Sequence, residues 1–96
     1  MRYVITGSYT QAKDWISKDL AVRKSLGEEC STRDYRYVDD ASIIRGVRNP
    51  RGVFAGTWKS RSDIHGIITQ LLVATDENAP SIEVLRKIWL DVNLKE

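Results

Sequence analysis

Three short stretches of the chain carry the residue types that could bind an anion or a partner. They are Gly7, Ser8, Tyr9 and Thr10; Asp39 and Asp40; and Gly56, Thr57 and Trp58. Backbone N–H groups and hydroxyls in the first stretch could hold a phosphate at the start of a helix. That stretch matches neither the P-loop pattern nor Gly-x-Gly-x-x-Gly, so a tight turn at Gly7 and a helix cap at Thr10 would also explain it. Trp58 could stack on a base or pack against a partner, or it could cover the edge of the core.

Cations gather in one segment, residues 45–61, which we call the arginine-rich segment. Its five cations lie within 17 residues and are Arg45, Arg48, Arg51, Lys59 and Arg61. Arginine binds phosphate and carboxylate with a planar fork of N–H donors, so the segment could contact an anion or a nucleic-acid backbone. It could equally be a solvated loop, or contain an arginine that ties the loop down by pairing with Asp39 or Asp40.

Metal binding and catalysis are less well supported by the residue pattern. Asp39 and Asp40 could be metal-binding carboxylates at a strand end, but neighbours in a strand point to opposite faces, and Asp40 could simply cap a helix. His65 has no serine or cysteine at a readable triad spacing. Cys30 is the single cysteine, so no internal disulfide is expected. We expect no catalytic residues, no metal site and no cofactor.

The elements that position these residues follow from the hydrophobic pattern. Strands are predicted at 3–6, 35–38 and 53–57, and helices at 11–26, 41–45, 63–74 and 81–90, with 91–96 as a fraying tail. Thr10, Asp40 and Ser62 are the predicted N-caps, and Gly27 is placed to end the first long helix.

Strands that alternate with helices predict a single α/β domain over residues 1–96, with a parallel sheet and an extra C-terminal helix. The run at 3–6 is the most apolar, so it is predicted at the centre of a three-stranded sheet of order 2-1-3. Parallel sheets bind ligands beyond the carboxyl ends of their strands. The three stretches named at the start should therefore share one edge, which we call the strand-end rim.

Bulk properties set the broad class. The chain has 96 residues, a net charge of +2 and 42% hydrophobic residues, which is typical of one small soluble domain. It contains neither a membrane-length apolar run nor a secretion signal, and a reducing cytoplasm suits its lone cysteine. An open sheet edge in so small a domain makes a homodimer plausible.

The motifs also resemble a known group. The opening run from Tyr3 to Tyr9, a tryptophan at Trp15, the run from Tyr37 to Arg48, and Gly56 to Trp58 followed by Asp63 and Ile64 are the features concerned. Together they resemble small Rossmann-like proteins encoded by bacteriophages and prophages. The resemblance covers residues 2–72 and implies a phage accessory protein in the cytoplasm of a bacterial host. It implies no activity.

Two functional hypotheses follow. The first is a non-enzymatic accessory protein that binds a host protein, or a nucleotide or nucleic-acid anion, through the rim and the arginine-rich segment. The alternative is a small nucleotide-handling enzyme, with Ser8 or Thr10 on a phosphate, Arg45 and Arg48 as an anion clamp and Asp39 on a metal. The alternative lacks a recognisable base and a known loop signature.

Overall fold

A three-stranded parallel sheet organises the molecule. The computed structural model describes residues 1–94, and the strands are β1 (Arg2–Ile5), β2 (Tyr35–Tyr37) and β3 (Arg51–Phe54). Their order is β2-β1-β3, with Arg2 in register with Tyr35 on one side and with Arg51 on the other. The predicted α/β class, parallel sheet and 2-1-3 order are confirmed. Val4 and Ile5 are fully buried, because the central strand is covered on both faces.

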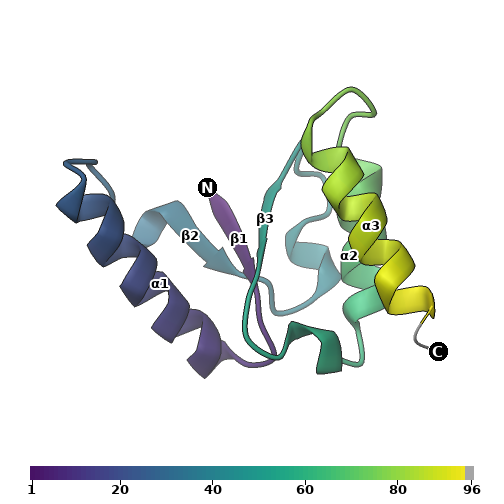
Figure 1. Cartoon of the computed structure of the whole chain (residues 1–96), viewed down its shortest axis with the longest axis horizontal. Helices are drawn as coiled ribbons and strands as arrows, with labels where there is room; N and C mark the ends of the chain where they lie inside the picture. Colours follow the sequence, from purple (N-terminus) through teal and green to yellow (C-terminus); the bar gives the residue numbers. More distant parts are fainter. Residues whose placement is uncertain (95–96) are drawn as a thin grey trace.

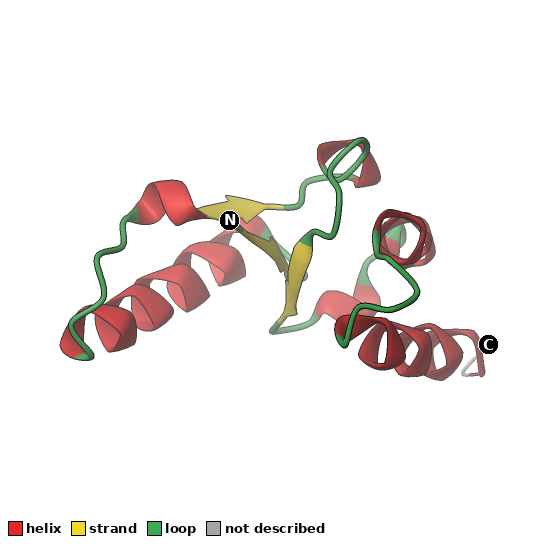
Figure 2. Ribbon diagram, turned by 90° about the horizontal axis from the view of Figure 1, so that it is seen from above, coloured by secondary structure: helices red, strands yellow, loops and turns green. Residues whose placement is uncertain are grey.

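Helices cover the two faces of the sheet (Figures 1 and 2). Helix α1 (Tyr9–Ser25) lies on one side, and α2 (Ile64–Ala74) and α3 (Ser81–Leu94) lie together on the other. Alternate residues of β1 point to opposite faces. Val4 therefore packs with Ala12 of α1, whereas Ile5 packs with Ile67 and other residues of α2 and α3. The result is a three-layer arrangement with a small core under α1 and a larger one under α2 and α3.

The ends of α1 show one wrong prediction and one correct one. Ser8 is the N-cap, and its Oγ accepts a hydrogen bond from the backbone N–H of Gln11 at 3.3 Å; Thr10 already lies inside the helix. At the other end Gly27 has φ +82°, as a C′ glycine requires. The backbone N–H of Gly27 donates to Lys24 and that of Glu28 to Arg23, which is the Schellman pattern.

The predicted strand at 53–57 starts two residues late and ends three residues late, since β3 spans Arg51–Phe54. It begins at Arg51, because the backbone of residues 51 and 52 lies in register with Arg2 and Tyr3 of the central strand. It stops at Phe54, and Gly56 then turns the chain with φ +61°. Trp58 is consequently in a short 3-10 turn, η3 (Trp58–Ser60), rather than at the end of the strand.

Helix α2 begins without the predicted serine cap. Asp63 occupies the N-cap position and makes no side-chain cap bond, because its carboxylate binds Arg61 instead. Helix α3 runs on to Leu94, so the predicted tail is wrong for residues 91–94; Val92 is buried in the core, which keeps the last turn in place. Residues 95 and 96 of that predicted tail lie outside the described residues.

A polar cluster ties α1 to the start of the sheet. Asp19 of α1 binds Arg2 of β1 and accepts a hydrogen bond from the Tyr35 hydroxyl at 2.6 Å. Arg23 donates to the same hydroxyl at 3.2 Å and lies 3.6 Å from the Glu28 carboxylate. We call Arg2, Asp19, Arg23, Glu28 and Tyr35 the strand-start cluster.

Candidate functional site

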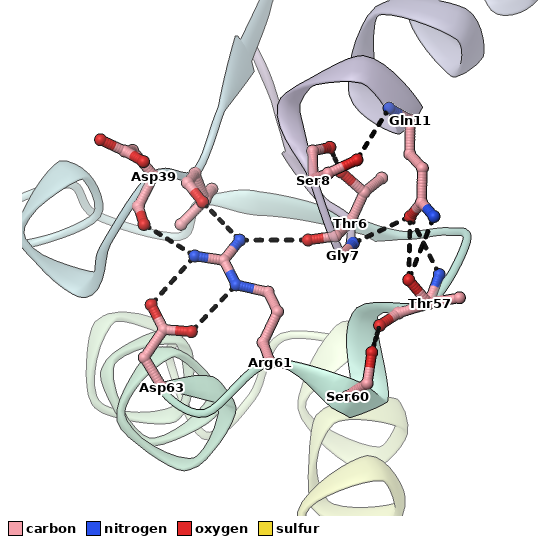
Figure 3. Close-up of polar contacts among 10 residues, drawn as sticks. Thr6, Gly7, Ser8, Gln11, Asp39, Thr57, Ser60, Arg61 and Asp63 are labelled. Atoms are coloured by element: carbon pink, nitrogen blue, oxygen red, sulfur yellow. Dashed lines mark hydrogen bonds and ion pairs between the residues drawn. The ribbon is translucent and has the colours of Figure 1, made fainter.

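The strand-end rim forms as predicted where β1, β2 and β3 stop, but two side chains outside the predicted site connect its parts. Arg61 reaches the ends of β1 and β2, and Gln11 joins the loop after β1 to the loop after β3 (Figure 3). Gly7, Asp39 and Thr57 are therefore held in one neighbourhood by side chains of this chain.

All five N–H donors of Arg61 are used. Nη1 donates to the carbonyl oxygens of Thr6 at 3.2 Å and Val38 at 2.6 Å, and Nη2 donates to that of Asp39 at 2.7 Å. The remaining two N–H groups form a bidentate pair with the Asp63 carboxylate, both at 2.9 Å. Because a guanidinium has five donors in a fixed fork, no donor is left for a bound anion. Arg61 thus acts as a clasp between two strand ends and the start of α2.

The electrostatics of Arg61 agree with a structural role. The side chain is only 7% exposed, and this burial acts to lower its pKa. The hydrogen bonds and charge of Asp63 outweigh that effect, so the pKa of Arg61 is raised from its ordinary value. The guanidinium also lies 5.6 Å from the centroid of the Tyr37 ring. A buried charge paired in this way is costly to disturb.

Gln11 fills the crevice between the ends of β1 and β3. Its Oε1 accepts from the backbone N–H of Gly7 at 3.0 Å and from that of Thr57 at 3.1 Å, while Nε2 donates to the Thr57 hydroxyl at 3.1 Å (Figure 3). This crevice is where open α/β sheets bind ligands. Here the two N–H groups that could meet a ligand oxygen already hold an oxygen of the protein.

Two rim glycines are required by this close packing. A Cβ added to Gly7 would lie 2.0 Å from Thr57 Oγ1, and one added to Gly56 would lie 2.4 Å from Gln11 Oε1. Both distances are far inside van der Waals contact. Gly7 and Gly56 are therefore explained by the approach of two loops and by the positive φ of Gly56, without a ligand.

Two polar side chains predicted for the site, those of Ser8 and Asp40, have local partners. The Ser8 Oγ caps α1. Asp40 accepts from the backbone N–H of Ser42 at 2.7 Å and from its hydroxyl, and these bonds, with smaller contributions from the charges of Arg45 and Arg61, lower the pKa of Asp40. Capping by Asp40 is confirmed, but the predicted helix at 41–45 is a short 3-10 turn, η2 (Ala41–Ile43). Asp39 meets Arg61 through its backbone, and its side chain is exposed.

Aromatic residues of the rim differ in exposure. Tyr9 is 59% exposed and packs edge-on against Tyr37, with ring centroids 5.6 Å apart. Trp58 is half-buried, packs edge-on against Phe54 at 4.9 Å and lies against the larger core. Trp58 therefore covers the edge of the core, which is one of the two roles predicted for it.

The arginine-rich segment does not form one surface. Arg45 is exposed and close enough to Asp40 to affect its pKa. Arg48 is exposed and lies 3.9 Å from Asp76, which follows the end of α2. Arg51 begins β3, at the edge of the sheet opposite the rim. Of the three arginines predicted for the site, only Arg45 is linked to rim residues.

Sequence reasoning grouped Arg61 with the other cations. It gave as one alternative that an arginine ties the segment to Asp39 or Asp40, without singling out Arg61, and it missed Gln11 and Asp63 as rim residues. For Arg61 a local signal exists, since Asp63 follows two positions later, yet its other partners are backbone carbonyls that every residue carries. For Gln11, the available signal was the prediction that two glycine-containing loops, those after the first and third strands, lie close together.

Neither a metal-ligand cluster nor a membrane-spanning helix is found in the described part of the chain. Among residues 1–94, no group of three or more histidine, cysteine, aspartate or glutamate side chains could hold a metal ion. Over the same residues, no helix has both the length and the apolar character needed to cross a membrane. Comparison with protein-family models, curated proteins and solved structures found no match to this chain.

Proposed function

We propose that this chain is a non-enzymatic accessory protein, of phage or prophage origin, that acts by binding a host protein through the strand-end rim. The observation that carries the proposal is the self-contained rim. Arg61 and Gln11 hold the backbone polar groups there in hydrogen bonds within the chain. Such a rim is pre-organised, and pre-organisation lowers the cost of binding a partner.

The exposed residues on the rim support a protein partner. Tyr9, Thr10, Asp39, Arg45 and Thr57 are all exposed, and tyrosine and arginine are enriched at binding hot spots. The phage origin rests on the resemblance of the motifs described above. A cytoplasmic location and a homodimer remain parts of the same proposal.

The enzyme alternative receives less support. Ser8 Oγ is occupied as a helix cap, and Arg48 lies beside Asp76 rather than beside Arg45's neighbour Asp40. The phosphate-binding group and the two arms of the anion clamp therefore do not converge. No specific observation on the described residues favours a nucleotide-handling enzyme over a binding protein.

The proposal is tested by capturing partners on the immobilised protein with matched charge reversals. Bacterial lysate is passed over wild type, Arg45→Glu and Asp39→Lys, and over Arg48→Glu and Arg51→Glu as controls at the opposite edge. A specific host protein should bind wild type and both controls, and its retention should fall at least about tenfold on the rim variants. Equal retention on all five would overturn the role of the rim.

Thermal unfolding in the presence of nucleotides distinguishes the enzyme alternative from the binding proposal. A rise in melting temperature with one nucleotide, lost in both Arg45→Ala and Arg48→Ala, would favour the enzyme. Circular dichroism of each variant confirms that it is folded before any loss of binding is interpreted.

A further inference from the structure

A second hollow lies outside the crevice, between α1 and β2. It has a volume of about 390 Å³, within the range of roughly 300 to 1,000 Å³ that small-molecule sites occupy. Its apolar part consists of Ile16 and Leu20 of α1. Tyr35 and Tyr37 contribute from β2, because alternate residues of a strand share a face. We call it the α1–β2 groove.

Polar groups are placed around the apolar part. Ser17 of α1 and Thr32, which precedes β2, bring hydroxyls to the lining. The Tyr35 hydroxyl is already used by Asp19 and Arg23, so this residue supplies a wall and not a free donor. The groove thus combines an apolar surface with a small number of hydrogen-bonding groups, which is the usual composition of a ligand site.

Its charge is positive. Lys13 is the charged side chain of the lining. The nearest acidic residues of α1 are engaged by cations, since Asp14 lies 3.0 Å from Lys18 and Asp19 binds Arg2. The exposed ammonium of Lys13 lies 5.8 Å from the centre of the Tyr9 ring. An anionic group at this position would therefore meet a cation and no carboxylate of the lining.

The rings of Tyr9 and Tyr37 stand at the end of the groove that adjoins the rim. They meet edge to face at 64°. Tyr9 remains 59% exposed, with the Lys13 ammonium over its ring. Planar bases stack on such exposed tyrosine faces with little dependence on sequence. Ring and cation lie side by side here, because Tyr9 and Lys13 are one helical turn apart on α1.

We propose that the α1–β2 groove binds a planar aromatic ring that carries an anionic group, such as a nucleoside monophosphate or the same unit in a single strand. The ring packs against Tyr9, Tyr37 and Ile16, and the phosphate lies at Lys13. The groove adjoins the protein-binding rim and shares Tyr9 with it. Its failure would still leave the rim proposal standing, because that proposal is tested at Arg45 and Asp39, which lie outside the groove lining.

The test is an NMR titration of the ¹⁵N-labelled protein with AMP, adenosine and ribose 5-phosphate. AMP should shift amide resonances of residues 9–20 and 32–37, and each of its two halves should bind at least about tenfold more weakly, because ring and phosphate contribute separately. Lys13→Gln should raise the Kd for AMP about tenfold and leave that for adenosine unchanged. Tyr9→Leu should weaken both ligands.

Lys24→Gln is the matched control, since it makes the same change at an exposed lysine near the other end of α1. An oligonucleotide of eight thymidines distinguishes the two sources of the ligand. If the oligonucleotide binds much more tightly than AMP, and its affinity falls with salt as expected for several phosphate contacts, the ligand is a single-stranded nucleic acid. If the two bind with equal strength, the ligand is a free nucleotide. Absence of AMP shifts in the groove, or equal effects of Lys13→Gln and Lys24→Gln, would overturn the proposal.

Discussion

The two ends of the sheet are fastened in different ways. At the strand-end rim, Arg61 donates to three backbone carbonyls and one carboxylate. In the strand-start cluster, Arg2, Asp19, Arg23 and Tyr35 bind one another through side chains. The rim depends chiefly on Arg61, which has many partners, with Gln11 as a second link. The cluster distributes its bonds over several residues.

Because of this difference, a single substitution should cost more stability at one end of the sheet than at the other. Removing Arg61 leaves several groups without their donors at once, and an unsatisfied buried polar group costs more than a hydrogen bond normally contributes. Removing one member of the strand-start cluster breaks fewer bonds: loss of Asp19 takes the partner of Arg2 away, but Tyr35 keeps its bond from Arg23. We therefore expect the rim to be the more fragile end, and the following predictions test that order.

The largest effect is expected for Arg61→Met, which retains an apolar stem but no donors. It should lower the free energy of unfolding by about 3 to 5 kcal/mol, because the carbonyls of the fully buried Thr6 and Val38 lose their donor and each unsatisfied buried group costs about 1 to 3 kcal/mol. Urea denaturation measures the change. Arg86→Met is the control, because Arg86 pairs with Glu83 at the surface with half of its side chain exposed, and it should change stability by less than about 1 kcal/mol. Equal losses would contradict the clasp.

Gly7→Ala should destabilise the fold by about 1 to 3 kcal/mol, as overpacking does, because the new Cβ would lie 2.0 Å from Thr57 Oγ1. Adding Thr57→Ala should restore part of the loss, which a double-mutant cycle by urea denaturation would detect. Gly27→Ala provides the comparison without a clash, since its Cβ would meet nothing within 4 Å. There the loss comes from backbone strain alone, and Thr57→Ala should restore none of it.

In the strand-start cluster, Asp19→Asn should cost about 1 to 2 kcal/mol at pH 7, less than Arg61→Met. The hydrogen bond from Tyr35 lowers the pKa of Asp19 below its ordinary value of 3.8, and Arg2 lowers it further. A lowered pKa stabilises the fold above the unfolded-state pKa, and this contribution is lost as pH falls through the folded-state value. The difference between wild type and Asp19→Asn should therefore shrink below pH 3.8. A constant difference from pH 7 to pH 2 would argue against this role of Asp19.

The smallest effect is expected at Gln11, whose bonds are near the surface. Gln11→Leu should lower the free energy of unfolding by about 1 kcal/mol, because the backbone N–H groups of Gly7 and Thr57 lose their acceptor. Gln11→Glu keeps an acceptor for both N–H groups, and the Thr57 hydroxyl can donate to it, so stability at pH 7 should stay within about 0.5 kcal/mol of wild type. Thermal unfolding compares the two. Equal losses would show that acceptance of these two bonds is not what Gln11 contributes.

Local patterns predicted the parts of the fold that depend on local chemistry. The apolar run at 3–6 identified the central strand, Gly27 marked a helix end, and Asp40 was recognised as a cap. In each case the physical cause lies within a few residues of the signal. The 2-1-3 order followed because only one strand was apolar enough to be covered on both faces.

The features that the sequence did not predict involve partners that are distant in the chain or are backbone carbonyls. Arg61 binds carbonyls of Thr6, Val38 and Asp39, which no side-chain pattern distinguishes from any other carbonyl. Ser62 was expected to cap α2, but Asp63 holds the N-cap position and Arg61 takes its carboxylate. Arg48 and Arg51 were grouped with Arg45 by closeness in sequence, and a strand that begins at Arg51 carries them to the opposite edge.

The position of Arg61 has a consequence for how the chain folds during its synthesis on the ribosome. The middle strand is synthesised first, but its second neighbour ends at Phe54 and the guanidinium that joins the strand ends comes later still. A nascent chain stalled before residue 61 would hold every strand and yet lack the fastening between them. The strand ends should therefore be joined only after Arg61 and the start of α2 have emerged.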